Sequence, residues 1–238
     1  MTIKHFIKKR IFEPYSSYYE KYRTGIIKSH INIDSNYKIL DFGGSSGKRM
    51  ANLFPERKKG IYIADISEKA LDIARTKYGF KTILLDESGT IPFEDKYFDF
   101  VFCNSVIEHV TVNKDDVYRI MSNKKFRDLS FSRQSKLAKE INRVGKQYFV
   151  QTPNKHFFIE SHLWFPSFLI YMPRRIQIAL FRLLNKFWIK KANPDFSLLT
   201  YRDMKMLFGD AKIIREKLFF FVKSYIAIKI SNPSWRSA

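Results

Sequence analysis

The sequence predicts an α/β fold in which helices surround a doubly wound, mostly parallel sheet. Short β-rich apolar runs recur between residues 37 and 152, and stretches with helical periodicity separate them. A glycine-rich turn directly follows the first run, where open parallel sheets bind their ligands. We therefore expect a ligand site at the carboxyl ends of the strands.

Length and charge narrow the class of protein. With 238 residues, 45% of them hydrophobic, the chain can bury a sizeable core, and its length favours one domain with insertions over two full domains. Forty-three Lys and Arg against 23 Asp and Glu give a formal net charge of +20. Such an excess predicts an anionic partner, which is nucleic acid, a phosphorylated substrate or an acidic membrane.

The single cysteine, Cys103, excludes a disulfide framework and a cysteine metal cluster, and it fits a reducing, cytoplasmic setting. The basic N-terminus lacks the apolar core and cleavage site of a secretory signal, so no export is expected. No apolar stretch approaches the roughly 18 to 20 residues that span a bilayer. Peripheral attachment to the inner face of the membrane stays open.

The predicted elements alternate along the chain. We expect five parallel strands, at 37–42, 60–66, 81–86, 98–104 and 146–152. Four helices are expected, at 47–53, at 67–78 with Ser67 as cap, within 113–121, and at 132–144.

Three further segments flank this core. Residues 1–30 mix basic, aromatic and aliphatic residues at helical spacing and predict an amphipathic lead-in. Residues 156–191 are aromatic and basic, are interrupted by prolines, and predict a helical insertion over the active face. Two β-rich runs within 211–230 predict a closing antiparallel pair.

The glycine-rich turn is the segment most informative about ligand binding. Gly43, Gly44 and Gly47 let the backbone bend sharply and approach a ligand closely. A phosphate loop is excluded, because its pattern requires glycine at Phe42 and a hydroxyl residue at Arg49. The dinucleotide pattern GxGxxG does not fit this turn either.

Asp41, Gly43, Ser45 and Gly47 resemble the acid-x-Gly-x-Gly-x-Gly turn of class I S-adenosylmethionine-dependent methyltransferases, with Ser45 in place of the middle glycine. Further matching motifs extend the resemblance from about residue 37 to 154. It implies a Rossmann-like fold and S-adenosylmethionine as cofactor.

The resemblance also implies roles for individual residues. Asp65, at the end of the second strand, is similar to the acid that binds both ribose hydroxyls. Asp86 is placed to receive the adenine amino group, although Glu87 could exchange roles with it. The expected cofactor-binding residues are Asp41, Gly43, Gly44, Ser45, Gly47, Asp65, Ile66, Asp86, Glu87 and Asn104.

Two histidines are candidate catalytic bases. The Glu108-His109 pair resembles one at the end of strand four in the subgroup that includes ubiquinone-biosynthesis methyltransferases. A histidine near neutral pKa can receive the proton of a hydroxyl acceptor. Alternatively, Glu108 and His109 form a polar cap after the strand. His162, in the segment expected to cover the acceptor, is either a second base or a hydrogen-bonded loop residue.

We expect a single methyltransferase domain over 1–238, made of a lead-in (1–36), a cofactor-binding core (37–154), an insertion or lid (155–200) and closing strands (201–238). The predicted acceptor is a hydroxyl or amine of a small-molecule, sugar or lipid-linked compound, and it is anionic. One alternative is an RNA methyltransferase, favoured by the net charge. Another is a non-catalytic binding protein with this fold.

The stretch 174–191 predicts an amphipathic helix with apolar residues along one side and basic residues near the other. One interpretation lays this helix on an anionic membrane. The other packs it on the domain as a lid.

Overall fold

The computed structural model describes residues 10, 13–31, 33–57, 59–86, 89–160, 165–187 and 191–231. The chain divides into two compact units, residues 1–35 and 36–238. In the first, helix α2 (Glu13–His30) occupies most of the described residues. That both units belong to the single expected domain stays a prediction.

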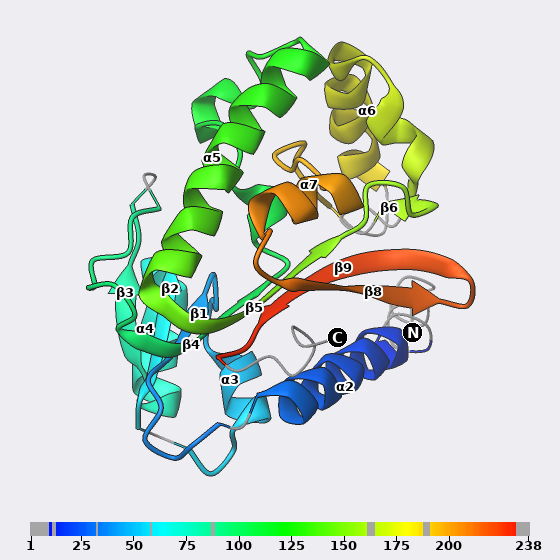
Figure 1. Cartoon of the computed structure of the whole chain (residues 1–238). Coiled ribbons are helices and arrows are strands. Elements are labelled where there is room, and N and C mark those ends of the chain that lie inside the picture. Colours follow the sequence, from blue (N-terminus) through cyan, green and yellow to red (C-terminus); the bar gives the residue numbers. More distant parts are fainter. Residues whose placement is uncertain are drawn as a thin grey trace. The chain divides into compact units, whose positions relative to one another are not determined.

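The second unit holds a seven-stranded sheet of order β3-β2-β1-β4-β5-β9-β8 (Figure 1). Its strands are β1 (Ile39–Phe42), β2 (Ile61–Asp65), β3 (Lys81–Leu84), β4 (Phe98–Asn104), β5 (Gly145–Pro153), β8 (Lys212–Leu218) and β9 (Phe221–Lys229). β9 runs antiparallel to both neighbours, whereas the pairs from β3 to β5 are parallel. The mostly parallel, Rossmann-like fold and its closing antiparallel strands are thus confirmed.

The strand order reverses at β1, because β2 lies on one side of it and β4 on the other. Ligands of open α/β sheets bind in the crevice beside such a switch point. Alternate strand residues such as Leu40, Val101 and Tyr148 pack with Leu137 and Ile141 of helix α5 (Asn123–Val144) in one apolar cluster. This packing fixes the position of the carboxyl ends of the strands, where the site lies.

The predicted helices need two corrections. Helix α3 (Lys48–Leu53) and helix α4 (Glu68–Tyr78) agree with expectation, and the Ser67 side chain accepts a bond from the Ala70 amide. α5 begins nine residues earlier than the predicted start at 132, because the Ser122 side chain caps it at the Lys125 amide.

The helix expected within 113–121 is wrong. Only a short 3₁₀ turn, Lys114–Asp116, forms there. None of the three residues of this turn is buried, so no apolar face supports a longer helix.

The insertion contains β6 (Ile159–Glu160), β7 (Phe165–Pro166), a 3₁₀ turn (Ser167–Tyr171) and helix α6 (Arg174–Phe187). Phe181 and Leu184 of α6 are buried in a cluster with Leu169 and Phe196. The main apolar side of α6 is therefore covered by protein, which favours the packed helix over a helix that lies on a membrane. Helix α7 (Tyr201–Leu207) follows the insertion.

No helix among the described residues combines the length and apolar character that crossing a membrane requires.

Candidate functional site

The turn after β1 depends on its glycines. Gly43 and Gly47 have left-handed backbones, with φ of +71° and +72°. A Cβ atom at Gly43 would collide with the Val106 side chain, and one at Gly47 would lie 2.9 Å from the Phe80 ring. The turn therefore tolerates no side chain at these two positions without a shift of its neighbours.

Ser45 adopts the same left-handed region, with φ of +50°. This is the position where the resembled motif has its middle glycine, so the backbone keeps the glycine-type conformation despite the substitution. Such a conformation costs a non-glycine residue about 1 kcal/mol or more. The Ser45 amide donates to Oδ2 of Asp65 at 2.9 Å, and this bond helps to hold it.

Asp65 joins the turn to the end of β2. Its Oδ2 accepts from the Ser45 amide and its Oδ1 from the Ser67 amide, both at 2.9 Å. An ionised carboxylate has about four acceptor positions, so each oxygen keeps one for a further donor. The structure thus brings the two expected halves of the cofactor site into direct contact.

Asp41 lies beneath the turn and is only 2% exposed. A Cβ atom on Gly44 would overlap the Asp41 carboxyl group, which locates that group against the turn. Burial raises the pKa of Asp41 from 3.8 to about 7, against the opposing effect of Arg49. Its Oδ2 has no hydrogen-bond partner among the described residues.

The other expected cofactor residues lie at the neighbouring strand ends. Asn104 ends β4 and donates from Nδ2 to Ser105 Oγ at 3.2 Å. Ile66, after β2, is 57% exposed, and Asp86, after β3, is exposed as well. Glu87 and His162 lie outside the described residues.

The Glu108 and His109 side chains have different surroundings. Both lie in a 3₁₀ turn, Ile107–His109, but Glu108 is fully buried and its Oε2 accepts from Thr152 Oγ1 at 3.0 Å. His109 is partly exposed, with Nδ1 3.7 Å from Oδ1 of Asp195 and its ring against Phe196.

Asp195 is a residue that sequence reasoning missed. It lies in the segment between α6 and α7, and no pattern links it to His109 in the sequence. Only the folded insertion brings it there: the Ser197 amide donates to the Glu108 carbonyl at 2.8 Å.

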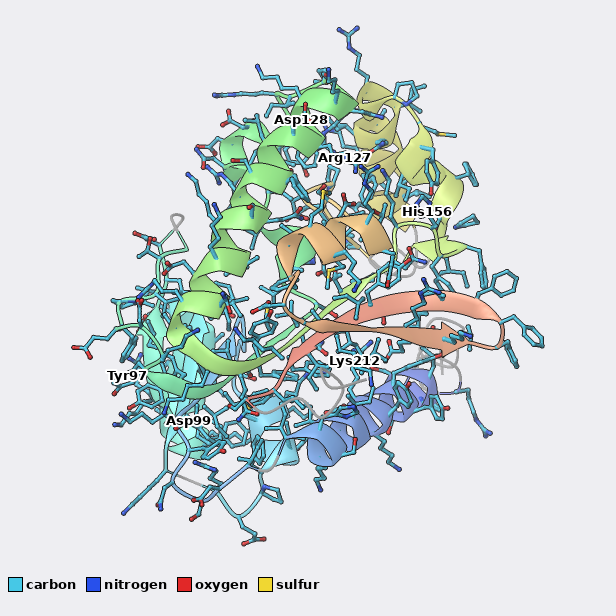
Figure 2. All side chains as sticks on the ribbon, in the orientation of Figure 1. Tyr97, Asp99, Arg127, Asp128, His156 and Lys212 are labelled. Carbon is cyan, nitrogen blue, oxygen red and sulfur yellow. The ribbon has the colours of Figure 1, made fainter. Side chains whose placement is uncertain are left out.

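A cleft of about 740 Å³ opens between α5, α6 and α7. Its wall includes four basic residues and two acidic ones, namely Lys124, Arg127, Lys155, Arg174, Asp128 and Asp203. Figure 2 shows Arg127 near the end of α5 that adjoins α6. Phe196 also lines the cleft, so the cleft and His109 contact the same residue.

Burial lowers the pKa of Lys155, and the nearby Arg127 adds to this effect. Arg127 donates to Asp203 at 3.2 Å, so part of its charge is balanced. The sequence did not predict this cleft, because the first turns of α5 were not expected to be helical. Among the described residues, no cluster of His, Cys, Asp or Glu is arranged to hold a metal.

Comparison with known proteins finds one family model that matches the core. Residues 40–147 match the family model described as "Methyltransferase domain". No curated protein matches the sequence.

Solved structures share the fold. The PH0226 protein from Pyrococcus horikoshii OT3 aligns with 90% of this chain and 89% of its own, at 17% identity and a TM-score of 0.52. Geranyl diphosphate C-methyltransferase from Streptomyces coelicolor A3(2) aligns with 88% of this chain and 78% of its own, at 10% identity and a TM-score of 0.53. A SAM-dependent methyltransferase from Aquifex aeolicus covers 86% of both chains at 16% identity, with a TM-score of 0.47.

The matched segment contains the glycine turn, Asp65 and the ends of the first four strands. Residues 40–147, somewhat less than half of the chain, thus match the methyltransferase-domain family.

Proposed function

We propose that S-adenosylmethionine binds in the crevice between β1 and β4, with its ribose on Asp65. The Asp65 carboxylate carries this proposal, because it already accepts from the Ser45 and Ser67 amides and keeps acceptor positions for two hydroxyls. The Oδ2 of buried Asp41, which has no hydrogen-bond partner in the described part of the chain, adds a second acceptor beneath the same turn.

When bound, the cofactor supplies an activated methyl group. The chain then has to hold the acceptor atom in line with that group and exclude water. His109 is the proposed proton acceptor, and Asp195, 3.7 Å away, would stabilise its protonated form. The proposed acceptor group is a hydroxyl or amine.

The proposed acceptor is a small anionic compound, a sugar intermediate or a lipid-linked precursor among them. The cleft beside Phe196 supports this, because its four basic residues outnumber its two acidic ones. Candidate acceptors can be screened by release of S-adenosylhomocysteine. For an acceptor that binds there, Lys155→Gln should raise KM about tenfold with little change in kcat. The reason is that Lys155 would stabilise the bound acceptor equally in the ground state and in the transition state.

Titration calorimetry tests the cofactor site directly. Asp65→Asn should weaken binding of S-adenosylmethionine and S-adenosylhomocysteine at least about tenfold, because charge-assisted bonds contribute about 1.5–3 kcal/mol each. Asp72→Asn is the matched control, since Asp72 is an exposed acid on α4 whose carboxylate forms a long ion pair with Arg75 at 3.9 Å. Failure of the unaltered protein to bind either compound would overturn the proposal.

An RNA acceptor is the second candidate, and the net charge of +20 favours it. Binding of transfer RNA at low ionic strength should then fall steeply as salt rises. Release of S-adenosylhomocysteine with RNA, but with none of the small anionic acceptors, would favour this candidate.

A further inference from the structure

The tip of the β8–β9 hairpin exposes three consecutive phenylalanines. Phe219, Phe220 and Phe221 are 84%, 94% and 59% exposed. Phe158, itself 48% exposed, contacts the Phe221 ring edge-on with centroids 5.3 Å apart. The Ser167 amide donates to the Phe158 carbonyl, which brings the exposed Phe168 into the same neighbourhood. We call Phe158 and Phe219–Phe221 the aromatic tip.

The turn at this tip breaks the usual rules of turn chemistry. Leu218 pairs with Phe221, so only Phe219 and Phe220 form the turn. Two-residue hairpin turns favour glycine, asparagine and aspartate because they need left-handed backbone. Phe219 takes such a conformation, with φ of +52°. Both local stability and solubility would favour other residues here, which is typical of a surface kept for binding.

Basic residues stand directly behind the tip. The two strands carry Arg215, Lys217 and Lys223 near the turn, and the first two are exposed. The one acid of the two strands, Glu216, is fully buried and bonds to Ser224. The solvent-facing charge of this part of the hairpin is therefore positive.

We infer that the aromatic tip inserts into a lipid bilayer with acidic headgroups. A narrow protruding turn buries its rings most completely in a fluid phase that closes around it, whereas a folded partner would need a matching pocket. Peripheral membrane proteins commonly place aromatic rings in the membrane–water interface and basic residues at the level of the lipid headgroups. This surface differs from α6, whose main apolar side is already buried.

Vesicle co-sedimentation of the full chain tests the inference. We expect binding to phosphatidylcholine vesicles that contain phosphatidylglycerol, and weaker binding to phosphatidylcholine alone. The double variant Phe219→Gly, Phe220→Asn should bind at least about tenfold more weakly, because it removes two large apolar groups from the interface. Its unfolding temperature should be no lower, since glycine and asparagine suit the turn.

Two controls make the test specific. The double variant Ile73→Ser, Leu129→Ser removes exposed apolar side chains from α4 and α5 and should leave vesicle binding unchanged. Phe220→Cys provides an exposed thiol for an environment-sensitive dye, because Cys103 is buried, and the dye emission should shift to the blue on acidic vesicles.

Three results would overturn the inference. The first is that the unaltered chain does not bind acidic vesicles, and the second is that the glycine-asparagine variant binds them equally well. The third is that sedimentation velocity shows the unaltered chain as a dimer and the variant as a monomer. The last result would assign the tip to a second copy of the chain.

Discussion

At the residue scale, the site rests on rare backbone conformations next to a buried acid. Gly43, Ser45 and Gly47 all have positive φ within five residues, and Asp41 is buried beneath them. The Ser45 amide of this turn donates to the Asp65 carboxylate, so the geometry of the turn and the charge of the site depend on each other.

Alanine at Gly43 should destabilise the fold more than alanine at Gly79. Both glycines have φ near +70°, but a Cβ at Gly43 would collide with Val106, and one at Gly79 meets nothing within 4 Å. Gly79→Ala should cost about 1 kcal/mol of unfolding free energy, and Gly43→Ala about 1–3 kcal/mol more. Urea denaturation of both variants checks this, and equal losses would show that Val106 yields freely.

Replacing Asp41 by asparagine should change how stability depends on pH. The folded pKa of Asp41 is raised to about 7, so its protonated form favours folding, and this contribution is lost as pH rises from about 3.8 to 7. An asparagine side chain at this position would not titrate. The stability of Asp41→Asn relative to the parent should therefore rise by up to about 4 kcal/mol between pH 4 and pH 8, at about 1.36 kcal/mol per pKa unit.

Chemical denaturation across this pH range measures the effect. A constant difference between variant and parent would mean that the Asp41 carboxyl is better solvated, or better paired with Arg49, than its burial indicates.

The proximity of the glycine turn and Asp65 could be expected from the sequence, because their spacing follows from one strand, one turn and the next strand. Their roles in cofactor binding stay predictions. Asp195 was not found, because the fold brings it to His109 from 86 positions away in the chain. Position in sequence carries no signal for such a contact.

At the element scale, α5 is held at its C-terminal end by one arginine. Arg143 bonds both oxygens of Glu140 at 2.8 Å and also the carbonyls of Ile91 and Phe93. The pKa of Glu140 is lowered mainly by its bond with Arg143. The network thus ties the loop before β4 to the helix that packs on the sheet.

Arg143→Ala should destabilise the protein by about 1–3 kcal/mol, because charged and carbonyl partners lose their donor together. Arg75→Ala is the matched control on α4, where Arg75 pairs with Glu68 and both side chains are about half exposed. That surface pair should contribute about 0–1 kcal/mol. Urea midpoints of both variants decide the matter, and equal shifts would contradict a special role of Arg143.

Elements with clear periodicity were predicted well, and those without it were not. The strands and α4 agree with the sequence because apolar spacing and the Ser67 cap are explicit. The first turns of α5 were missed because residues 123–131 are mostly polar, and only Phe126 and Ser130 among them are buried. Tertiary contacts of these two residues, which the sequence does not display, support that part of the helix.

At the scale of the whole molecule, the large positive net charge should affect stability. A formal net charge of +20 implies that like charges repel one another across the surface and oppose compactness. Unfolding temperature should therefore rise when sodium chloride is raised from about 0.02 to 0.2 M, because the screening length falls with ionic strength. Differential scanning fluorimetry checks this. A steady fall in unfolding temperature over the same range would show that attractive ion pairs outweigh repulsion.

The position of β9 has a consequence for synthesis on the ribosome. β5 ends at Pro153, yet its outer neighbour β9 begins only at Phe221, 68 positions later along the chain. Until β9 leaves the exit tunnel, the nascent sheet has an open edge whose amide and carbonyl groups lack partners. Translation that stops after β5 but before β9 would therefore release a product with an unpaired, aggregation-prone edge strand, which chaperones or proteases must remove.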